Sequence, residues 1–344
     1  MNGGRRRIRS YMKHLHDPKF IRLYFLGAVF FLASAILGIL LGATPLSLGH
    51  LLGGIINFGA GGPAATIVWY VRFPRVAAGL LCGSALAVAG AVIQGVLANR
   101  LASPSIIGVN SGAGLAVTVC CALGVTGGWR LSLFAFLGAF AAVMLVSMGA
   151  KKWSASRGTV ILMGVAMNSL LGAFSDAITS VIPEVSISRN DFRIGDFSGV
   201  TYGKLIPAAV VILLGILALR TLAGELDVLA LGDETAKSLG MNTSFMRLLF
   251  LLLAALLSGA AVSVAGLLSF VGLLVPHAIR KVAGNQSRHL IPLCALFGGG
   301  FVALCDTFAR SIFAPYELAV GIIMAFLGAP FFLALLLRKG GRHG

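Results

Sequence analysis

The sequence predicts an all-α polytopic membrane protein, with about ten transmembrane helices arranged as two inverted-repeat halves. Three observations support this fold class: the composition, the uneven distribution of cations, and a repeated glycine-rich motif. Hydrophobic residues make up 58% of the 344 residues and charged residues only 11%, whereas a soluble domain carries about 25% charge. At about 20 residues per span, the length accommodates roughly nine to eleven helices.

Long apolar runs place the predicted helices along the chain. The first run, Leu23 to Gly42, is too long for the core of a signal peptide, so we interpret it as a membrane anchor. Residues 21–337 then form one transmembrane domain, preceded by a basic segment (1–20) and followed by a short tail (338–344). The predicted spans are 21–42, 75–98, 104–124, 130–150, 158–182, 204–220, 246–265, 268–283, 290–311 and 317–337.

The lysines and arginines test this topology. With ten spans, both termini lie on one side of the membrane, and that side collects 20 of the 27 cations. The opposite side holds the remaining 7, which are Arg72, Arg75, Arg130, Arg189, Arg193, Lys204 and Arg310. Because cytosolic loops are enriched in lysine and arginine, this bias predicts that both termini are cytosolic.

A repeated motif predicts the two inverted halves. Residues 83–90 read GSALAVAG and residues 259–266 read GAAVSVAG, with five of eight positions identical. The two motifs lie on the second and seventh predicted spans, an odd number of crossings apart, so they run in opposite directions, as in many transporters. Chance similarity between Gly/Ala-rich helices is the alternative. The G-x-x-x-G pairs Gly79/Gly83 and Gly108/Gly112 predict close helix packing.

The composition and motifs also exclude several classes of function. The net charge of +16 does not indicate nucleic-acid binding, because the cations lie in loops between spans. The five cysteines lie in apolar runs without a C-x-x-C pair and are expected to be small buried hydrophobes. No phosphate-binding loop, metal cluster or nucleophile–base constellation is apparent, so an enzyme is not expected and no cofactor or metal is expected on this chain.

Six motifs, in order, together resemble the FecCD-type permeases, the membrane subunits of ABC importers for iron–siderophores, haem and vitamin B12. The similarity covers nearly the whole chain beyond about residue 45. The motifs are RFPR at 72–75, GSALAVAGAVIQ at 83–94, NRLASPSIIGVNSGAG at 99–114, LGDETAKSLG at 231–240, GLLSFVGLLVPHAIR at 266–280 and the segment 306–330.

The resemblance implies a bacterial or archaeal cytoplasmic-membrane permease that forms a dimer; a homodimer is expected, with a heterodimer as the alternative. Its implied partners are two copies of an ATP-binding cassette ATPase, which hold ATP and Mg²⁺, and an extracytoplasmic substrate-binding protein. The implied cargo is a ferric siderophore first, with haem or cobalamin as the other candidates.

An ATP-driven importer that lacks its own phosphate loop needs a cytosolic contact with its ATPase. The best candidate is the loop 221–245, which carries LGDETAKSLG and is predicted to be helical at 233–239 between two glycines. By resemblance, this loop forms two short coupling helices. A merely solvated amphipathic loop is the alternative. The expected ATPase-coupling residues are Gly232, Glu234, Ala236, Leu239 and Gly240.

Three arginines on the side with few cations are expected at the outer rim: Arg72, Arg75 and Arg310. By resemblance they meet glutamates of the binding protein, where opposite charges speed encounter and fix orientation. For Arg310 the alternative is a local i,i+4 pair with Asp306. Arg72 and Arg75 flank Pro74 at a predicted helix start and have no nearby acid in the sequence.

The resemblance also implies a cytosolic gate and a translocation path. The gate falls on two turns, with residues Asn99, Leu101, Ala155 and Ser156. Ordinary capping of the fifth span by Ser156 is the alternative there. The path follows the fifth and tenth spans, and the expected residues on the fifth are Asn168, Ser175, Asp176 and Thr179. Three of these share a helical face, whereas Asp176 is either functional or simply hydrated near the outer end.

An ion-coupled secondary transporter that uses Asp176 and Asp306 is the competing function. Inverted repeats occur there too, and that reading predicts transport by this chain alone, without ATP. Two acids near the ends of spans would make a sparse proton relay.

Overall fold

The computed structural model describes residues 18–44, 47–56, 62–152 and 156–340. A helix occupies each of the ten predicted spans, and the bounds agree within three residues apart from the starts of the second and the third. In the described chain, seven helices or continuous helical stretches are long and apolar enough to cross a membrane. They involve α2 (Pro18–Leu40), α5 (Phe73–Val96), α7 (Gly128–Lys152), α8 (Arg157–Val181), α10 (Tyr202–Thr221), α13 (Thr243–Ala265) and α15 (Ser287–Ser311).

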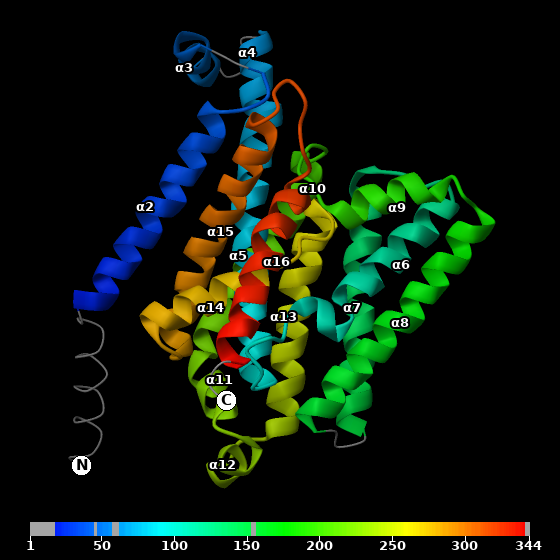
Figure 1. Cartoon of the computed structure of the whole chain (residues 1–344), viewed down its shortest axis with the longest axis vertical. Helices are drawn as coiled ribbons and strands as arrows, with labels where there is room; N and C mark the ends of the chain where they lie inside the picture. Colours follow the sequence, from blue (N-terminus) through cyan, green and yellow to red (C-terminus); the bar gives the residue numbers. More distant parts are fainter. Residues whose placement is uncertain (1–17, 45–46, 57–61, 153–155, 341–344) are drawn as a thin grey trace.

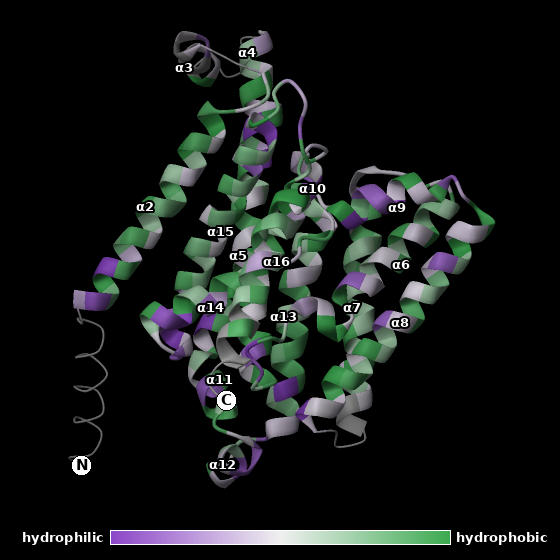
Figure 2. Ribbon diagram, in the orientation of Figure 1, coloured by the Kyte–Doolittle hydropathy of each residue, from purple (hydrophilic) through white to green (hydrophobic). Residues whose placement is uncertain are grey.

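The remaining predicted spans hold α6 (Val109–Ala122), α14 (Val271–Ala283) and α16 (Val320–Gly340). Helix α2 begins and α16 ends at the end of the molecule that carries α11 (Ala223–Ala230) and α12 (Asp233–Ser238) (Figure 1). We call this end the inner end. The opposite, outer end carries α3 (Leu48–Ile56) and α9 (Val185–Ile194). Apolar residues cover most of the ribbon between the two ends (Figure 2).

Helix α5 lies at the centre of the bundle. Nineteen of its 24 residues are buried, and it packs against α13, α14 and α15. Small residues make this possible, because a Cβ atom added to Gly83 would lie 2.3 Å from the carbonyl oxygen of Gly298 on α15. A Cβ added to Gly90 would lie 2.0 Å from that of Gly272 on α14. The predicted close packing of glycine-rich helices is therefore confirmed for α5.

The two inverted halves repeat one order of elements. After its first span (α2 or α10), each half has a long helix (α5 or α13), a break in the α-helix, a short helix (α6 or α14), and then two longer helices. Helix α5 runs from the outer end inward and α13 runs outward, so their similar motifs are antiparallel (Figure 1). The short helices have 14 and 13 residues, about 20 Å at 1.5 Å per residue, which is less than the hydrocarbon core of about 30 Å.

A left-handed residue precedes each short helix. Gly108, with φ of 97°, precedes α6, and Phe270, with φ of 67°, precedes α14. A short 3-10 helix, η2 (Pro104–Ile107), fills the break in the first half, whereas residues 266–270 of the second half form no helix. Non-helical backbone at membrane depth is tolerated only where protein buries it or a cavity adjoins it.

The second predicted span starts earlier than the sequence indicated. Pro74 was expected at a helix start, but it lies inside a continuous helical stretch that begins with α4 (Pro63–Thr66) and passes through the π-helix η1 (Ile67–Arg72) into α5. The wider π turn accommodates a proline that would break an ordinary α-helix, because its hydrogen bonds skip one more residue. Helices α3 and α9 were likewise not predicted individually.

Candidate functional site

The loop between α10 and α13 folds as two short helices at the inner end, α11 and α12. The predicted helix at 233–239 corresponds to α12. Gly232 and Gly240 flank it with φ of 120° and 83°, a region that favours glycine. Ala236 is fully buried, whereas Glu234 and Leu239 are exposed. Of the five expected coupling residues, one is therefore buried, two are glycines at the ends of α12, and two have exposed side chains.

Asp233, the first residue of α12, anchors this loop to two other helices. One carboxylate oxygen accepts a hydrogen bond from Arg157 at 3.0 Å, and the other accepts one from Arg247. Arg157 begins α8 and Arg247 lies in the second turn of α13. Arg157 also donates to the Leu229 carbonyl at the end of α11. Asp233 was not among the predicted coupling residues, although it lies inside the LGDETAKSLG motif.

The two arginines control the ionisation of Asp233. Partial burial alone would raise its pKa, but hydrogen bonds and charge from Arg247 and Arg157 outweigh this effect and lower the pKa below its ordinary value. Asp233 is therefore ionised at neutral pH, and the contact between α12, α8 and α13 is charge-assisted.

The three outer arginines converge on the outer end of the bundle, where all are buried. Arg72 donates to the carbonyls of Ile39, Leu40 and Thr44 at 2.6–2.9 Å and so caps the carboxyl end of α2. Arg310 donates to the Gly38 carbonyl of the same helix. Their exposed fractions are only 2% each.

Arg75 lies at the centre of an ion network that the sequence did not reveal. It contacts Asp306 at 3.0 Å, Glu317 at 2.6 Å and Asp196 at 3.7 Å. Asp306 also contacts Arg310 at 3.5 Å, which is the local i,i+4 pair considered as the alternative. The network joins α5, α15 and the two outer connections that contain Asp196 and Glu317.

This burial does not fit the expectation that Arg72, Arg75 and Arg310 present free cations to a binding protein. Internal carbonyls and carboxylates of this chain already contact their guanidinium groups, because the tertiary fold supplies acids and carbonyls that are mostly distant in sequence. Docking by these three side chains stays a prediction that the described conformation does not support. Glu317 and Asp196, with side chains 35% and 31% exposed, are the accessible members of the network.

The expected gate residues lie at two inner turns. Asn99 follows α5, and its side chain accepts a hydrogen bond from the Leu101 backbone at 2.9 Å, which stabilises the turn after the left-handed Ala98. Ser156 caps α8 by accepting from the Thr159 backbone at 3.2 Å, the structural role considered as the alternative. Ala155 lies outside the described residues. A gating role for these residues stays a prediction.

The polar face of α8 points into the protomer. Asn168 donates to the Ser105 carbonyl and accepts from Ser111, both in the neighbouring η2–α6 segment. Ser175 is 4% exposed, and Thr179 accepts a hydrogen bond from Arg189 of α9. These three residues share a face as predicted, but that face packs against other helices of the chain. That these residues line the translocation path stays a prediction, and this packing does not support it.

Asp176 differs from its neighbours because its side chain is 69% exposed, and it contacts Arg189 at 2.7 Å. Asp306, by contrast, is buried between Arg75 and Arg310. The two acids proposed for an ion-coupled transporter are thus each paired with arginine. Among the described residues, no group of three His, Cys, Asp or Glu gathers as a metal site.

Comparison with known proteins covers almost the entire chain. The model of the FecCD transport family matches residues 30–338. The Fe(3+)-citrate import system permease protein YfmD of Bacillus subtilis is 39% identical over 274 residues, covering 80% of this chain and 82% of the relative. The cobalamin import system permease protein BtuC of Halobacterium salinarum is 38% identical, covering 82% and 76%.

A solved structure has the same fold. A metal-chelate type ABC transporter in an inward-facing conformation superposes with a TM-score of 0.80 at 27% identity, covering 92% of this chain and 99% of that chain. The similarity in sequence and the similarity in structure therefore point to the same class of membrane protein.

Proposed function

Because this chain belongs to the FecCD transport family and is the permease subunit of an ABC importer, we propose that it moves a ferric chelate, a ferric siderophore first, across the cytoplasmic membrane. Two separate ATPase subunits hydrolyse the ATP, and an extracytoplasmic binding protein delivers the chelate. Two copies of the chain form the membrane channel, with both termini in the cytosol. Haem and cobalamin are the alternative cargoes.

The anchored helix α12 is the observation that supports this proposal. A membrane subunit driven by a separate ATPase needs a cytosolic contact that transmits motion to its helices. Helix α12 offers such a contact, because Asp233 connects it to the first turn of α8 and the second turn of α13. Leu231, Leu239 and Phe245, which are 65%, 64% and 52% exposed, surround it with apolar surface suited to a partner protein.

A ferric chelate is the favoured cargo because the more similar of the two relatives compared above is named for Fe(3+)-citrate import. The second relative is named for cobalamin import, which keeps cobalamin among the alternatives. The chain itself supplies the membrane passage, and the binding protein supplies much of the discrimination between chelates.

Reconstitution tests the proposal. The chain is placed in liposomes with its ATPase and binding protein, and ATP-dependent uptake of labelled ferric siderophore, haem and cobalamin is measured. We expect uptake of the ferric chelate, and we expect Leu239→Glu on α12 to abolish it. Leu123→Glu is the matched control, since Leu123 is 77% exposed at the outer end of α6. Uptake without ATP or the ATPase would instead favour the ion-coupled transporter.

A further inference from the structure

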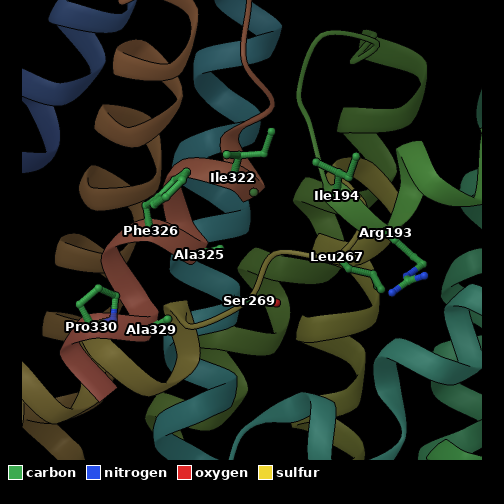
Figure 3. A pocket seen from close by; sticks show the side chains of 10 residues that line it. Arg193, Ile194, Leu267, Ser269, Ile322, Ala325, Phe326, Ala329 and Pro330 are labelled. Carbon is green, nitrogen blue, oxygen red and sulfur yellow. The ribbon is translucent and has the colours of Figure 1, made fainter. Parts of the chain in front are cut away.

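Two cavities of similar size lie beside different helices of the bundle. One, of about 570 Å³, lies between the end of α9, residues 267–269 and α16 (Figure 3). Helix α16 is the tenth span, along which the family resemblance implies the translocation path, so this cavity belongs to the function already proposed. The other cavity, of about 540 Å³, lies between α7, α10 and α13. None of its lining residues has a role in that function.

The second cavity is a groove that runs along the helices. Helices α7 and α10 pack against α13 much more than against each other, so a gap stays between them. Ala260 and Ser263 of α13 lie in this gap, whose lining extends over residues 129–136 of α7 and residues 203–211 of α10. At 1.5 Å per residue, these stretches are about 10–12 Å long. We call this cavity the α7–α10 groove, and its direction is that of an acyl chain in a bilayer.

The α7–α10 groove opens toward hydrocarbon. Leu133 and Leu137 on α7, like Ile206 and Val210 on α10, are exposed large apolar side chains. Neither helix contains an aspartate or a glutamate. In a chain that spans a membrane, an exposed apolar surface of this kind contacts acyl chains, and polar groups within it need a partner.

The outer end of the groove lies at the level of lipid headgroups. Trp129 is in the first turn of α7 and Tyr202 begins α10. Tryptophan and tyrosine concentrate at the boundary between hydrocarbon and water. Arg130 adds an exposed cation there, with its guanidinium carbon 5.9 Å from the centre of the Trp129 ring. The groove thus has a headgroup end and an acyl-chain end.

Lys204 gives the headgroup end of the groove its charge. It is the one charged residue of the lining, and it is half-buried. Its ammonium donates to the Gly199 carbonyl at 3.1 Å, and no carboxylate of the described residues forms an ion pair with it. A lysine ammonium carries three N–H donors. Lys204 can therefore donate to an anion as well as to the carbonyl.

The backbone at the same end complements a headgroup too. Helices α7 and α10 both begin there, and helix N-termini carry partial positive charge. No side-chain hydrogen bond caps α10. Pro207 has no N–H group and so cannot donate to the carbonyl of Gly203, four residues earlier. Gly203 lines the groove, which places a carbonyl acceptor beside the ammonium of Lys204.

We propose that the α7–α10 groove binds an anionic phospholipid of the outer leaflet, such as phosphatidylglycerol. One acyl chain lies between α7 and α10 over Ala260, and the phosphate accepts hydrogen bonds from Lys204. A glycerol hydroxyl of the headgroup donates to the Gly203 carbonyl. The lipid fills the gap between two helices that have few contacts with each other. This inference depends neither on the cargo nor on the use of ATP.

Lipid competition on the purified full-length chain tests the charge. The chain in detergent receives equal amounts of phosphatidylglycerol and phosphatidylcholine with the same acyl chains, and native mass spectrometry measures the lipids retained. Phosphatidylglycerol should be preferred, because the choline cation offsets the phosphate charge and donates no hydrogen bond. Lys204→Gln should lower this preference about tenfold, the effect of losing one charge-assisted contact. Lys204→Arg should keep most of it.

Arg193→Gln is the matched control for the charge. Arg193 is an exposed cation near the outer end that does not line the α7–α10 groove, so its variant should keep the native preference for phosphatidylglycerol. Equal preferences in Lys204→Gln and Arg193→Gln would overturn the proposal. So would competition by soluble glycerol 3-phosphate as strong as that by phosphatidylglycerol, because the site would then recognise a free phosphate and not a lipid.

Photolabelling in liposomes tests the location. Phosphatidylglycerol with a diazirine at the end of one acyl chain should label peptides from residues 129–136 and 203–211. Val211→Trp fills the groove and should reduce this labelling severalfold. Leu213→Trp is the control, since Leu213 is exposed on the same helix but lies outside the groove. Unchanged labelling in Val211→Trp would show that the acyl chain lies elsewhere and would contradict the proposal.

The same position tests whether a second copy of the chain covers the groove instead. The five native cysteines are buried, so Val211→Cys introduces an accessible thiol. In liposomes, oxidation of Val211→Cys should give monomers, because lipid separates the grooves of neighbouring copies. Covalent dimers would mean that another protein chain occupies the groove, and the lipid site would be wrong.

Discussion

Two clusters of arginine and aspartate, one near each end of the bundle, use the same chemistry in opposite surroundings. At the outer end, Asp306 lies between Arg75 and Arg310 with a side-chain exposure of 2%. At the inner end, Asp233 lies between Arg157 and Arg247 with an exposure of 37%. In both clusters one carboxylate connects two guanidinium groups from different parts of the chain.

The difference in burial assigns the clusters different roles. Removing one partner from a buried cluster leaves uncompensated charge in an apolar interior, so the outer cluster fixes the positions of α5 and α15. In the half-exposed inner cluster, water can replace a lost partner, so the contact can break and re-form at modest cost. A rigid outer junction and a reversible inner contact would suit the proposal that the ATPase acts on α12.

Removing the buried carboxylate is expected to have the largest effect of the changes that test this comparison. Asp306→Ala leaves Arg75 and Arg310 without their shared partner, and we expect a destabilisation of about 3–5 kcal/mol. The measurement is the thermal unfolding midpoint of the purified protein in detergent. Glu317→Gln is the control, since it removes a 35% exposed partner of the same Arg75 and should cost less than about 1 kcal/mol. Equal losses in the two variants would contradict the assigned difference in burial.

Removing the inner carboxylate should affect coupling more than folding. In Asp233→Ala, α12 loses its contacts with α8 and α13, so we expect binding-protein-stimulated ATPase activity of the complex to fall several-fold. The unfolding midpoint should change little, because the group is partly solvated. Glu225→Gln, an exposed acid on the neighbouring α11, controls for loss of charge in this loop. A large drop in the unfolding midpoint of Asp233→Ala would make the inner cluster structural like the outer one.

Lowering the pH is expected to have the smallest effect of these changes, and it tests the same comparison of the two clusters. Because Arg247 and Arg157 lower the pKa of Asp233, the stabilisation is present above the unfolded value of about 3.9 and is lost as pH falls through the lower folded value. After correction for the intrinsic exchange rate, the protection of the α12 amides against hydrogen exchange should therefore stay constant between pH 8 and 5. Protection should fall only in stronger acid, where Asp233 is protonated. Asp233→Asn should remove this acid-dependent step, and a step near neutral pH would contradict the assigned pKa direction.

The ten helical segments and their direction could be predicted from the sequence. Apolar runs of about 20 residues have few alternatives to a membrane helix, and the cation bias orients them. The inverted halves followed from one short motif, because Gly83 and Gly259, the first residues of its two copies, lie on the antiparallel helices α5 and α13. The helix at 233–239 was also predictable, since glycines flank it on both sides.

The pairing of charges and the packing around the helix breaks depended on tertiary structure. Arg75 pairs with Asp306, which lies 231 residues away in the sequence. The residues near Arg75 in the chain therefore did not indicate that it would form an internal ion pair. Whether the polar face of α8 pointed inward or outward could not be read from its period alone. The half-length helices α6 and α14 begin directly after the left-handed residues Gly108 and Phe270, and Phe270 packs closely against Gly328 of α16. Local hydropathy determines where helices form, whereas the side-chain packing between distant helices determines which groups are buried, paired or exposed to a ligand.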